Sequence, residues 1–409
     1  MKICKKVKIS PTKSQIELFD FWFRRCKRLY NVALDEKKFF YQATGKYLSL
    51  YEQKKELVGL KKDDPSWGDV PNKCLQEIIF RVDKAFVGFF GGNGYPKYKN
   101  DDTLKSIEFV EKDVRVKNGL VFLPKIKNGI CGVEPFPEKY STVKLKREGT
   151  NFFLCFTIEE KETVSTKLES PTVVGGDLGL KTLLTDSNGV EVKRFSKKMI
   201  GRYEQRIKEL NLSLSKKKKG SIRRQKVKKQ LQKAHSRLKN TRLDYLQKES
   251  TTYIKKTKEN VIVFGNLQVK DLMESDGTKR QQNFSRSYSQ TAISIFSKQV
   301  EYKAKKYNKE FHFANEEFTS KTCSCCGMVK HDLKVSDRIY HCTNCDKSIP
   351  RDLNAAINIK NVHLGTFHPI GIDLEGSIKR HQENKVKKLL GSNNRTKNAI
   401  RSVISTEYI

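Results

Sequence analysis

The sequence predicts an α+β chain with several domains, and three observations carry that prediction. Short alternating runs between residues 107 and 160 are separated by Gly and Asn turns, which is typical of antiparallel strands. Apolar residues recur at helical spacing in two long N-terminal runs. Two C-x2-C pairs near the C-terminus indicate a small metal-held module. At 409 residues the chain is long enough for about two to four domains.

The N-terminal part of the chain combines these strands and helices. We expect residues 1–10 to form an edge strand that completes a small barrel with the strands of 107–160. Ser14, with Glu17 three residues later, fits a capping box that opens the first helix. A second helix is expected from Asn72 to about Phe90, where a run of glycines ends it.

The net charge predicts a nucleic-acid partner. The chain has 82 Lys and Arg against 46 Asp and Glu, a formal charge of +36. Such an excess repels itself unless a polyanion is bound. A basic protein at a membrane surface is the alternative. It is weakened because the sequence has no 18-residue apolar run and no N-terminal signal segment. We therefore expect no membrane partner and a cytoplasmic protein.

Three basic segments are candidate nucleic-acid interfaces. They are one face of the first helix, a Tyr-Pro-Lys-Tyr-Lys motif suited to base stacking, and residues 216–239. The last segment has twelve Lys and Arg and no acidic residue, and we expect two antiparallel helices that turn near Gly220. A solvated surface is the alternative for each segment. The candidates are Arg24, Arg25, Arg28, Tyr95, Lys97, Tyr98, Lys99, Lys216, Lys217, Lys218, Lys219, Arg223, Arg224, Lys228 and Lys229.

Asp177 lies inside an apolar run that reads as the first strand of a hairpin. The run begins at Val173, and the second strand contains Leu183 and Leu184. Glycines on both sides of Asp177 allow another backbone or a phosphate to come close. A carboxylate within a buried strand is costly unless it binds a positive group. The arrangement is similar to that by which ribonuclease-H-like (RuvC-type) nucleases hold divalent metal, although a plain aspartate beside a turn is the alternative.

Four cysteines predict a structural zinc site. Cys323 and Cys326 form one C-x2-C knuckle, and Cys342 and Cys345 form a second. Four thiolates at this spacing suit tetrahedral zinc and leave no open coordination position for catalysis. A redox motif is the alternative for either pair taken alone. We expect Cys325, between two ligands, to point elsewhere.

Directly after the second knuckle, the motif RDLNAAINI at residues 351–359 resembles the TnpB family of transposon-encoded, RNA-guided nucleases, from which type V CRISPR effectors descend. Further segments in the family's order are KISPTKSQIELFDFWFRRCKRLYNVAL, AFVGFFGGNGYPKYK, LPKI, RLDYL and TSKTCSCCG. Each is modestly specific, and their order makes the resemblance specific. It covers nearly the whole chain.

The resemblance implies a fold with five parts. These are a wedge-type β-barrel (1–10 and 104–165), a helical recognition insert (11–103), a RuvC-like α/β domain (170–317 and 349–375) with a basic helical hairpin at about 195–257, a zinc ribbon (318–348) and a basic tail (376–409). It also implies a bacterial protein associated with the nucleoid. Its partners would be a guide RNA made from transposon-end sequence and a double-stranded DNA target beside a short motif.

In the family, three acidic residues hold two magnesium ions. Asp177 and Asp352 match the first and third, but the glutamate position is Gly265. Two closely spaced cations need several anionic oxygens, and glycine supplies none. Magnesium at this site is therefore in doubt. We expect a nuclease-inactive protein, not an enzyme, that represses transcription by guide-directed occupancy of its target.

Three alternatives remain open. The first is an active RNA-guided endonuclease in which another carboxylate replaces the missing glutamate. Glu259 would lie about 20 Å away along the strand, whereas Asp271 or Glu274 could return on a folded loop. The second is a guide-free DNA-binding repressor. The third, a ribosomal or chaperone-type RNA binder, would not explain the motifs around Asp177 and Asp352.

Overall fold

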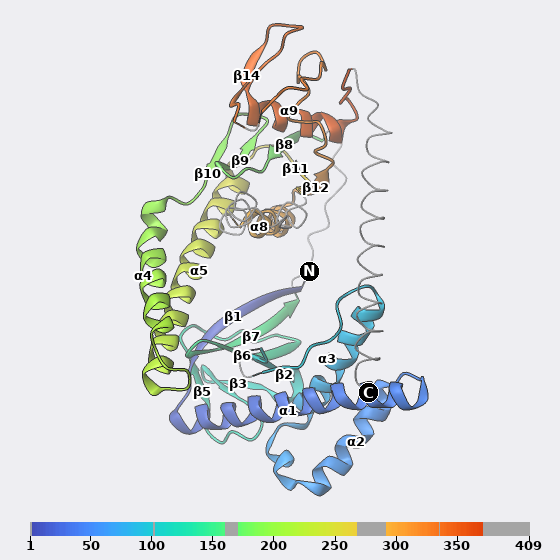
Figure 1. Ribbon diagram of the computed structural model, residues 1–409, viewed down its shortest axis with the longest axis vertical. Helices are drawn as coiled ribbons and strands as arrows, with labels where there is room; N and C mark the ends of the chain where they lie inside the picture. Colours follow the sequence, from blue (N-terminus) through green and yellow to red (C-terminus); the bar gives the residue numbers. More distant parts are fainter. Residues whose placement is uncertain (1, 101–102, 160–170, 268–291, 335, 371–409) are drawn as a thin grey trace. The chain divides into compact units, whose positions relative to one another are not determined.

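The computed structural model describes residues 2–100, 103–159, 171–267, 292–334 and 336–370 (Figure 1). The chain divides into two compact units. The first contains residues 1–162 and 205–237, and the second contains residues 163–204 and 238–409. Each unit is described by itself.

The first unit is built on a seven-stranded antiparallel sheet with the order β2-β6-β7-β1-β5-β4-β3. The N-terminal strand lies inside this sheet and pairs with β7 from Lys2↔Glu159 to Ile9↔Phe152. The prediction that it joins the all-β module is therefore confirmed, but the prediction of an edge strand is wrong, because β1 pairs with β7 on one side and β5 on the other. The strands are β1 (Lys2–Ser10), β2 (Ser106–Val110), β3 (Arg115–Lys117), β4 (Leu120–Phe122), β5 (Ile130–Gly132), β6 (Thr142–Glu148) and β7 (Asn151–Glu159), and a 3-10 turn, η2 (Glu111–Asp113), follows β2.

The helices of the first unit are α1 (Lys13–Thr44), α2 (Leu50–Asp63), η1 (Pro65–Asp69) and α3 (Asn72–Phe90). The limits predicted for α3 are confirmed, but the capping box is not formed by Ser14 and Glu17. The N-cap is Thr12, whose hydroxyl accepts from the Gln15 backbone N–H at 3.3 Å while the Gln15 side chain accepts from the Thr12 N–H. Thr12 has extended backbone angles directly after a proline, so the helix starts earlier than expected.

A hydrophobic core joins these helices to the sheet. The Trp22 ring of α1 lies 6.0 Å from Phe109 of β2 in an edge-on contact, and Phe19 lies 5.4 Å from Phe152 of β7. Helix α3 adds Leu75 and Ile78, which are fully buried. Large aromatic side chains therefore fix α1 on the sheet, with the basic residues of α1 outside this contact.

Two long helices, α4 (Lys197–Ser215) and α5 (Ile222–Lys256), form the predicted basic hairpin (Figure 1). They turn at Gly220, whose φ of +86° favours glycine. Arg242 of α5 forms an ion pair with Glu204 of α4 at 3.2 Å, and Arg224 donates to the Lys217 carbonyl near the turn. Contacts at both ends hold the helices antiparallel, so the prediction of a helical hairpin is confirmed.

The second unit contains a five-stranded mixed sheet with the order β10-β9-β8-β11-β12. Strand β11 is parallel to both β8 and β12, and β9 is antiparallel to β8 and to β10. The ends of β8, β11 and β12 therefore meet at one edge of the sheet. The strands are β8 (Val173–Asp177), β9 (Thr182–Asp186), β10 (Glu191–Lys193), β11 (Val261–Gly265) and β12 (Glu310–Ala314).

Helices α8 (Ile293–Lys306) and α9 (Arg351–Leu364) pack against this sheet. Helix α9 approaches β8 so closely that a Cβ added to Gly175 would lie 2.2 Å from the Ala356 carbonyl oxygen. Glycine is required there by this contact. The sequence also predicts a helix from Asn283 to Tyr307; only residues 292–307 of this stretch lie within the described residues, and they contain α8. Between β12 and α9, β13 (Ile339–His341) and β14 (Ser348–Pro350) form a two-stranded ribbon.

Candidate functional site

Asp177 ends strand β8 at the edge where the parallel strands meet. Burial, together with the negative charges of Asp352 and Glu316, raises the pKa of its carboxyl from 3.8 to about 7, against a smaller lowering by Arg351. Asp352 lies in the first turn of α9. The structure therefore brings together the two acidic residues named from the sequence, and it adds a third.

The third carboxylate is that of Glu316, two residues beyond strand β12. A Cβ added to Gly265 at the end of β11 would lie 2.7 Å from Glu316 Oε2. The carboxylate of Glu316 thus occupies the space into which a side chain at position 265 would extend. Burial raises its pKa from 4.5 to about 7. This edge of the sheet holds three carboxylates, and not the two that the sequence led us to expect.

The replacement residues considered from the sequence are not those found. Glu259 precedes β11 at its opposite end, where it accepts a hydrogen bond from Asn188 Nδ2 at 2.8 Å. Asp271 and Glu274 lie outside the described residues. Glu316 was missed because β12 itself was not predicted. The available signal was the Glu316–Glu317 pair just beyond an alternating run at 310–314, since neighbouring parallel strands end at one edge.

Two buried asparagines of α9 hold the segment that carries Glu316. Thr319 donates its hydroxyl to the Glu316 carbonyl at 2.7 Å. Asn358 Nδ2 donates to the carbonyls of Thr319 at 2.8 Å and Thr322 at 2.7 Å. Asn354 also donates to Thr322 at 2.7 Å and accepts from the Ser324 N–H at 2.9 Å. The helix that carries Asp352 therefore also positions the chain around Glu316.

Replacing Asn358 with alanine is expected to destabilise the second unit by about 1–3 kcal/mol, because two buried carbonyl oxygens lose a donor. The measurement is urea unfolding followed by circular dichroism. Asn361→Ala, in the less buried last part of the same helix, is the matched control and should change stability by less than about 0.5 kcal/mol. Equal unfolding midpoints for the two variants would contradict the role given to Asn358.

The carboxylate cluster also predicts how stability depends on pH. The folded-state pKa of Asp177 and of Glu316 is raised to about 7, whereas the unfolded groups titrate near 4. The folded chain therefore binds more protons between these values, and without magnesium this contribution to stability falls as the pH rises to about 7. Asp177→Asn removes one such group. Its melting temperature should exceed that of the wild type by more at pH 8 than at pH 6.

Added Mg²⁺ should reduce that difference, because it offsets the repulsion in the wild type at pH 8. The measurement is thermal unfolding in magnesium-free buffer and again with magnesium, with no chelator, so that any zinc stays bound. Glu317→Gln, one residue beyond the cluster, controls for the loss of one charge. A difference between Asp177→Asn and wild type that is the same at both pH values would contradict this account of the cluster.

The four predicted cysteines lie together in the segment between β12 and α9 that contains the two-stranded ribbon. Their Sγ atoms are all within 4.8 Å of one another, with Cys323–Cys345 at 3.7 Å and Cys326–Cys342 at 3.5 Å. Zinc bound to four thiolates at about 2.3 Å has sulfur–sulfur edges of roughly 3.8 Å, so the four thiols fit a tetrahedral zinc ion. Cys325 is exposed and outside the cluster, as expected.

No second group of three or more ligating side chains is as tightly gathered in the part of the chain that the structure describes. The carboxylates of Asp177, Glu316 and Asp352 are therefore less tightly gathered than the four thiols.

The basic candidates of the first unit differ in their surroundings. Arg24 and Arg28 are exposed, whereas Arg25 forms an ion pair with Asp64 at 2.9 Å and lies over the Trp67 ring. Arg25 is therefore engaged within the unit. In the aromatic motif, Tyr95 packs edge-on against Phe86 and Phe89, the Tyr98 hydroxyl donates to Asp35, and Lys99 lies over the Tyr30 ring. Lys97 is exposed.

In the hairpin, most of the candidate cations face solvent. The exception is Arg224, whose guanidinium donates to the carbonyl of Leu214 in the last turn of α4 and to that of Lys217 just beyond it. A basic side chain at a helix C-terminus can hydrogen-bond to the last carbonyls in this way. Lys217 is partly buried. The exposed residues are Lys216, Lys218, Lys219, Arg223, Lys228 and Lys229.

Two family models match parts of this chain. One is described as "Cas12f1-like, TNB domain" and matches residues 294–359, which include the cysteine cluster. The other is described as "Probable transposase" and matches residues 154–276. Together with the relatives below, these matches indicate a class of transposon-encoded proteins. They support the TnpB family that the sequence motifs resemble.

The relatives are distant but cover most of the chain. A Streptomyces pristinaespiralis protein named "Putative RNA-guided DNA endonuclease" is 26% identical, with 87% of each chain covered. An Escherichia coli protein named "Putative RNA-guided DNA endonuclease InsQ" is also 26% identical, over 82% of this chain and 85% of the relative. "TnpB-like protein L770" of Acanthamoeba polyphaga mimivirus is 24% identical, over 89% and 74%.

A solved structure titled "Structure of the mini-RNA-guided endonuclease CRISPR-Cas_phi3" aligns with 88% of this chain and 92% of its own, at 10% identity and a TM-score of 0.48. Within the described ranges, no helix combines the length and apolar character that a membrane crossing needs.

Proposed function

We propose that this protein is a catalytically active RNA-guided DNA endonuclease of the TnpB type, with Glu316 in the role of the glutamate absent from position 265. The observation that supports this proposal most directly is the distance of 2.7 Å between Glu316 Oε2 and a Cβ built on Gly265. A carboxylate just beyond the neighbouring strand β12 thus lies where a side chain at the end of β11 would otherwise extend. This proposal takes up the alternative stated from the sequence, and it replaces the nuclease-inactive expectation, which depended on Gly265 alone.

The three carboxylates are suited to divalent cations. Asp177, Glu316 and Asp352 supply oxygen ligands of the kind that magnesium prefers. Burial raises the pKa of both Asp177 and Glu316 to about 7, with added repulsion from neighbouring carboxylates at Asp177, so a bound cation would favour their ionised forms. These three side chains would hold the magnesium, which when bound would supply activation of a water molecule and stabilisation of the departing oxygen of a phosphodiester. The chain's own contribution is to fix the carboxylates at the strand ends and on α9.

The proposed partners are a guide RNA made from transposon-end sequence and a DNA duplex beside a short motif. The charge of +36 and the exposed cations of the α4–α5 hairpin support a polyanionic partner. The names of the bacterial relatives support guided DNA cleavage. We assign the seven-stranded module as a wedge-type barrel, the five-stranded unit as RuvC-like, and the cysteine cluster as a structural zinc ribbon.

The test is cleavage by the purified ribonucleoprotein. RNA that copurifies with the full chain is sequenced to identify the guide. A duplex library that carries the matching target beside randomised flanks is then incubated with the complex and Mg²⁺. Cuts that depend on the guide match are expected. A target that is bound specifically but left intact would overturn the proposal and favour a nuclease-inactive repressor. Binding of one fixed DNA sequence after RNase treatment would favour a guide-free repressor.

A further inference from the structure

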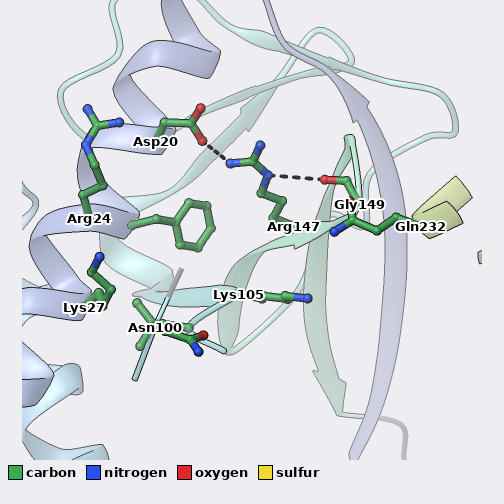
Figure 2. Close-up of a pocket in the computed structure, with 10 residues that line it drawn as sticks. Asp20, Arg24, Lys27, Asn100, Lys105, Arg147, Gly149 and Gln232 are labelled. Carbon is green, nitrogen blue, oxygen red and sulfur yellow. Dashed lines mark hydrogen bonds and ion pairs between the residues drawn. The ribbon is translucent and has the colours of Figure 1, made fainter. Parts of the chain in front are cut away.

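The first unit contains a basic cavity of about 340 Å³ that the carboxylate cluster does not involve. Figure 2 shows side chains from α1, from the segment before β2 and from the β6–β7 hairpin gathered around it. Four of the lining side chains are cationic and one is anionic. The lining residues are Asp20, Phe23, Arg24, Lys27, Asn100, Leu104, Lys105, Arg147, Gly149 and Gln232.

The wall on the sheet side is held by a set of hydrogen bonds. The Arg147 guanidinium pairs with the Asp20 carboxylate, and its Nε donates to the Gly149 carbonyl at 3.3 Å (Figure 2). The Arg147 backbone N–H donates to the Lys105 carbonyl at 2.9 Å. These bonds fix the guanidinium plane and the backbone on either side of it. The single carboxylate thus orients Arg147 as well as reducing the local charge.

The opposite wall is equally ordered. The Asn31 side chain of α1 accepts from the Lys99 N–H at 2.8 Å and donates to the Lys99 carbonyl at 3.0 Å. This pair of bonds fixes the backbone next to Asn100 on α1. Phe23 and Leu104, each 8% exposed, add an apolar surface beneath the cations. The cavity therefore combines one fixed guanidinium and three further cationic side chains with an apolar wall and two amide side chains.

This combination suits one nucleotide of a single strand. The volume lies at the lower end of the range of small-molecule sites, about 300–1,000 Å³. Arg and Lys bind phosphate oxygens, and an aromatic or apolar wall accepts a sugar or base. A duplex presents its phosphates on a convex surface, whereas a single strand can place a nucleotide in a recess. The amides of Asn100 and Gln232 can hydrogen-bond to a sugar hydroxyl or a base edge.

We propose that this cavity binds a nucleotide of single-stranded nucleic acid, with its phosphate at Arg24 and Lys105. The guide RNA and an unwound strand of the DNA target share this phosphodiester chemistry. The inference deepens the proposed function and rests on it for the identity of the partner. It does not depend on whether the protein cleaves DNA.

The test compares two double variants of the full chain that remove the same charge. Arg24→Ala with Lys105→Ala alters the cavity, whereas Lys8→Ala with Lys13→Ala removes two exposed lysines from β1 and α1 of the same unit. The probes are fluorescein-labelled oligo(U) and oligo(dT) of 12 nucleotides, titrated at several salt concentrations. The cavity variant should bind at least one probe about tenfold more weakly than the control does. For this variant, the slope of the logarithm of the binding constant against the logarithm of the salt concentration should become shallower by about 0.7 for each lost phosphate contact.

The outcomes separate the two sources of the strand. A loss for oligo(U) alone assigns the cavity to the guide, and a loss for oligo(dT) alone assigns it to the target strand. A loss for both assigns it to the shared backbone. The cavity variant behaving like the control with both probes overturns the proposal. As a second measurement, ultraviolet cross-linking of the wild type to either probe should label the peptide that contains Phe23, and the absence of that label would also count against it. Because binding is measured without cleavage, an inactive nuclease would leave this test unaffected.

Discussion

Replacing Glu316 with glutamine is expected to reduce guided DNA cleavage by more than about 100-fold while leaving target binding intact. Loss of groups that only support metal ligands already costs about 10–100-fold, and Glu316 is proposed as a ligand itself. The substitution keeps the size of the side chain beside Gly265 and removes its charge. The measurement pairs a cleavage time course with binding of the same labelled duplex. Glu317→Gln, the adjacent glutamate, is the matched control and should cleave like the wild type.

A relocation experiment sharpens this prediction. Gly265→Glu alone should lower activity, because its Cβ would lie 2.7 Å from Glu316 Oε2 and crowd the existing carboxylate. Gly265→Glu combined with Glu316→Gly should recover part of the lost activity, since a carboxylate then reaches the same place from β11. Full cleavage by Glu316→Gln would show that Glu316 has no catalytic role. If the double variant Gly265→Glu with Glu316→Gly is as inactive as Glu316→Gln, a glutamate at the end of β11 cannot act as a metal ligand.

The second large effect concerns the cysteine cluster. Cys342→Ser should abolish tight zinc binding and unfold the ribbon, because a structural zinc site contributes about 10–16 kcal/mol of apparent binding free energy and Cys342 is only 1% exposed. Zinc content by mass spectrometry of the purified protein and hydrogen exchange across residues 318–348 are the two measurements. Cys325→Ser is the matched control, because this exposed thiol lies outside the cluster. It should keep one zinc per chain. Equal zinc content in both variants would refute the assignment of the four ligands.

Features set by local spacing could be predicted from the sequence. The two C-x2-C pairs predicted the cysteine cluster, because knuckles of this length can bring four thiols together. Strong apolar periodicity predicts helix α3, and the uninterrupted apolar run at 261–265 predicts the buried strand β11. Helix α2 was missed because it buries only Gln53 and Leu57 and so has almost no apolar periodicity.

Features set by contacts between distant segments could not be predicted. In the sequence, Gly265 indicates that a carboxylate is missing from the end of β11. Only the parallel pairing of β11 with β12 reveals that the Glu316 carboxylate fills the space beside Gly265. In the same way, Arg25 and Arg224 look like surface cations in the sequence. In the structure, Arg25 forms an ion pair with Asp64, and Arg224 donates to carbonyls near the end of α4. Charge patterning locates a basic region, but it does not distinguish cations engaged in the fold from those left for a ligand.

Asn354 and Asn358 hold the stretch of chain between Glu316 and Cys323 against α9. The same stretch leads from the acidic cluster directly into the first zinc knuckle. Disorder in the ribbon would therefore loosen Glu316 from its neighbours, although no zinc ligand touches the nucleic-acid backbone in the proposed reaction. We expect zinc-starved or oxidised cells to contain protein that still carries its guide but has lost its cutting activity.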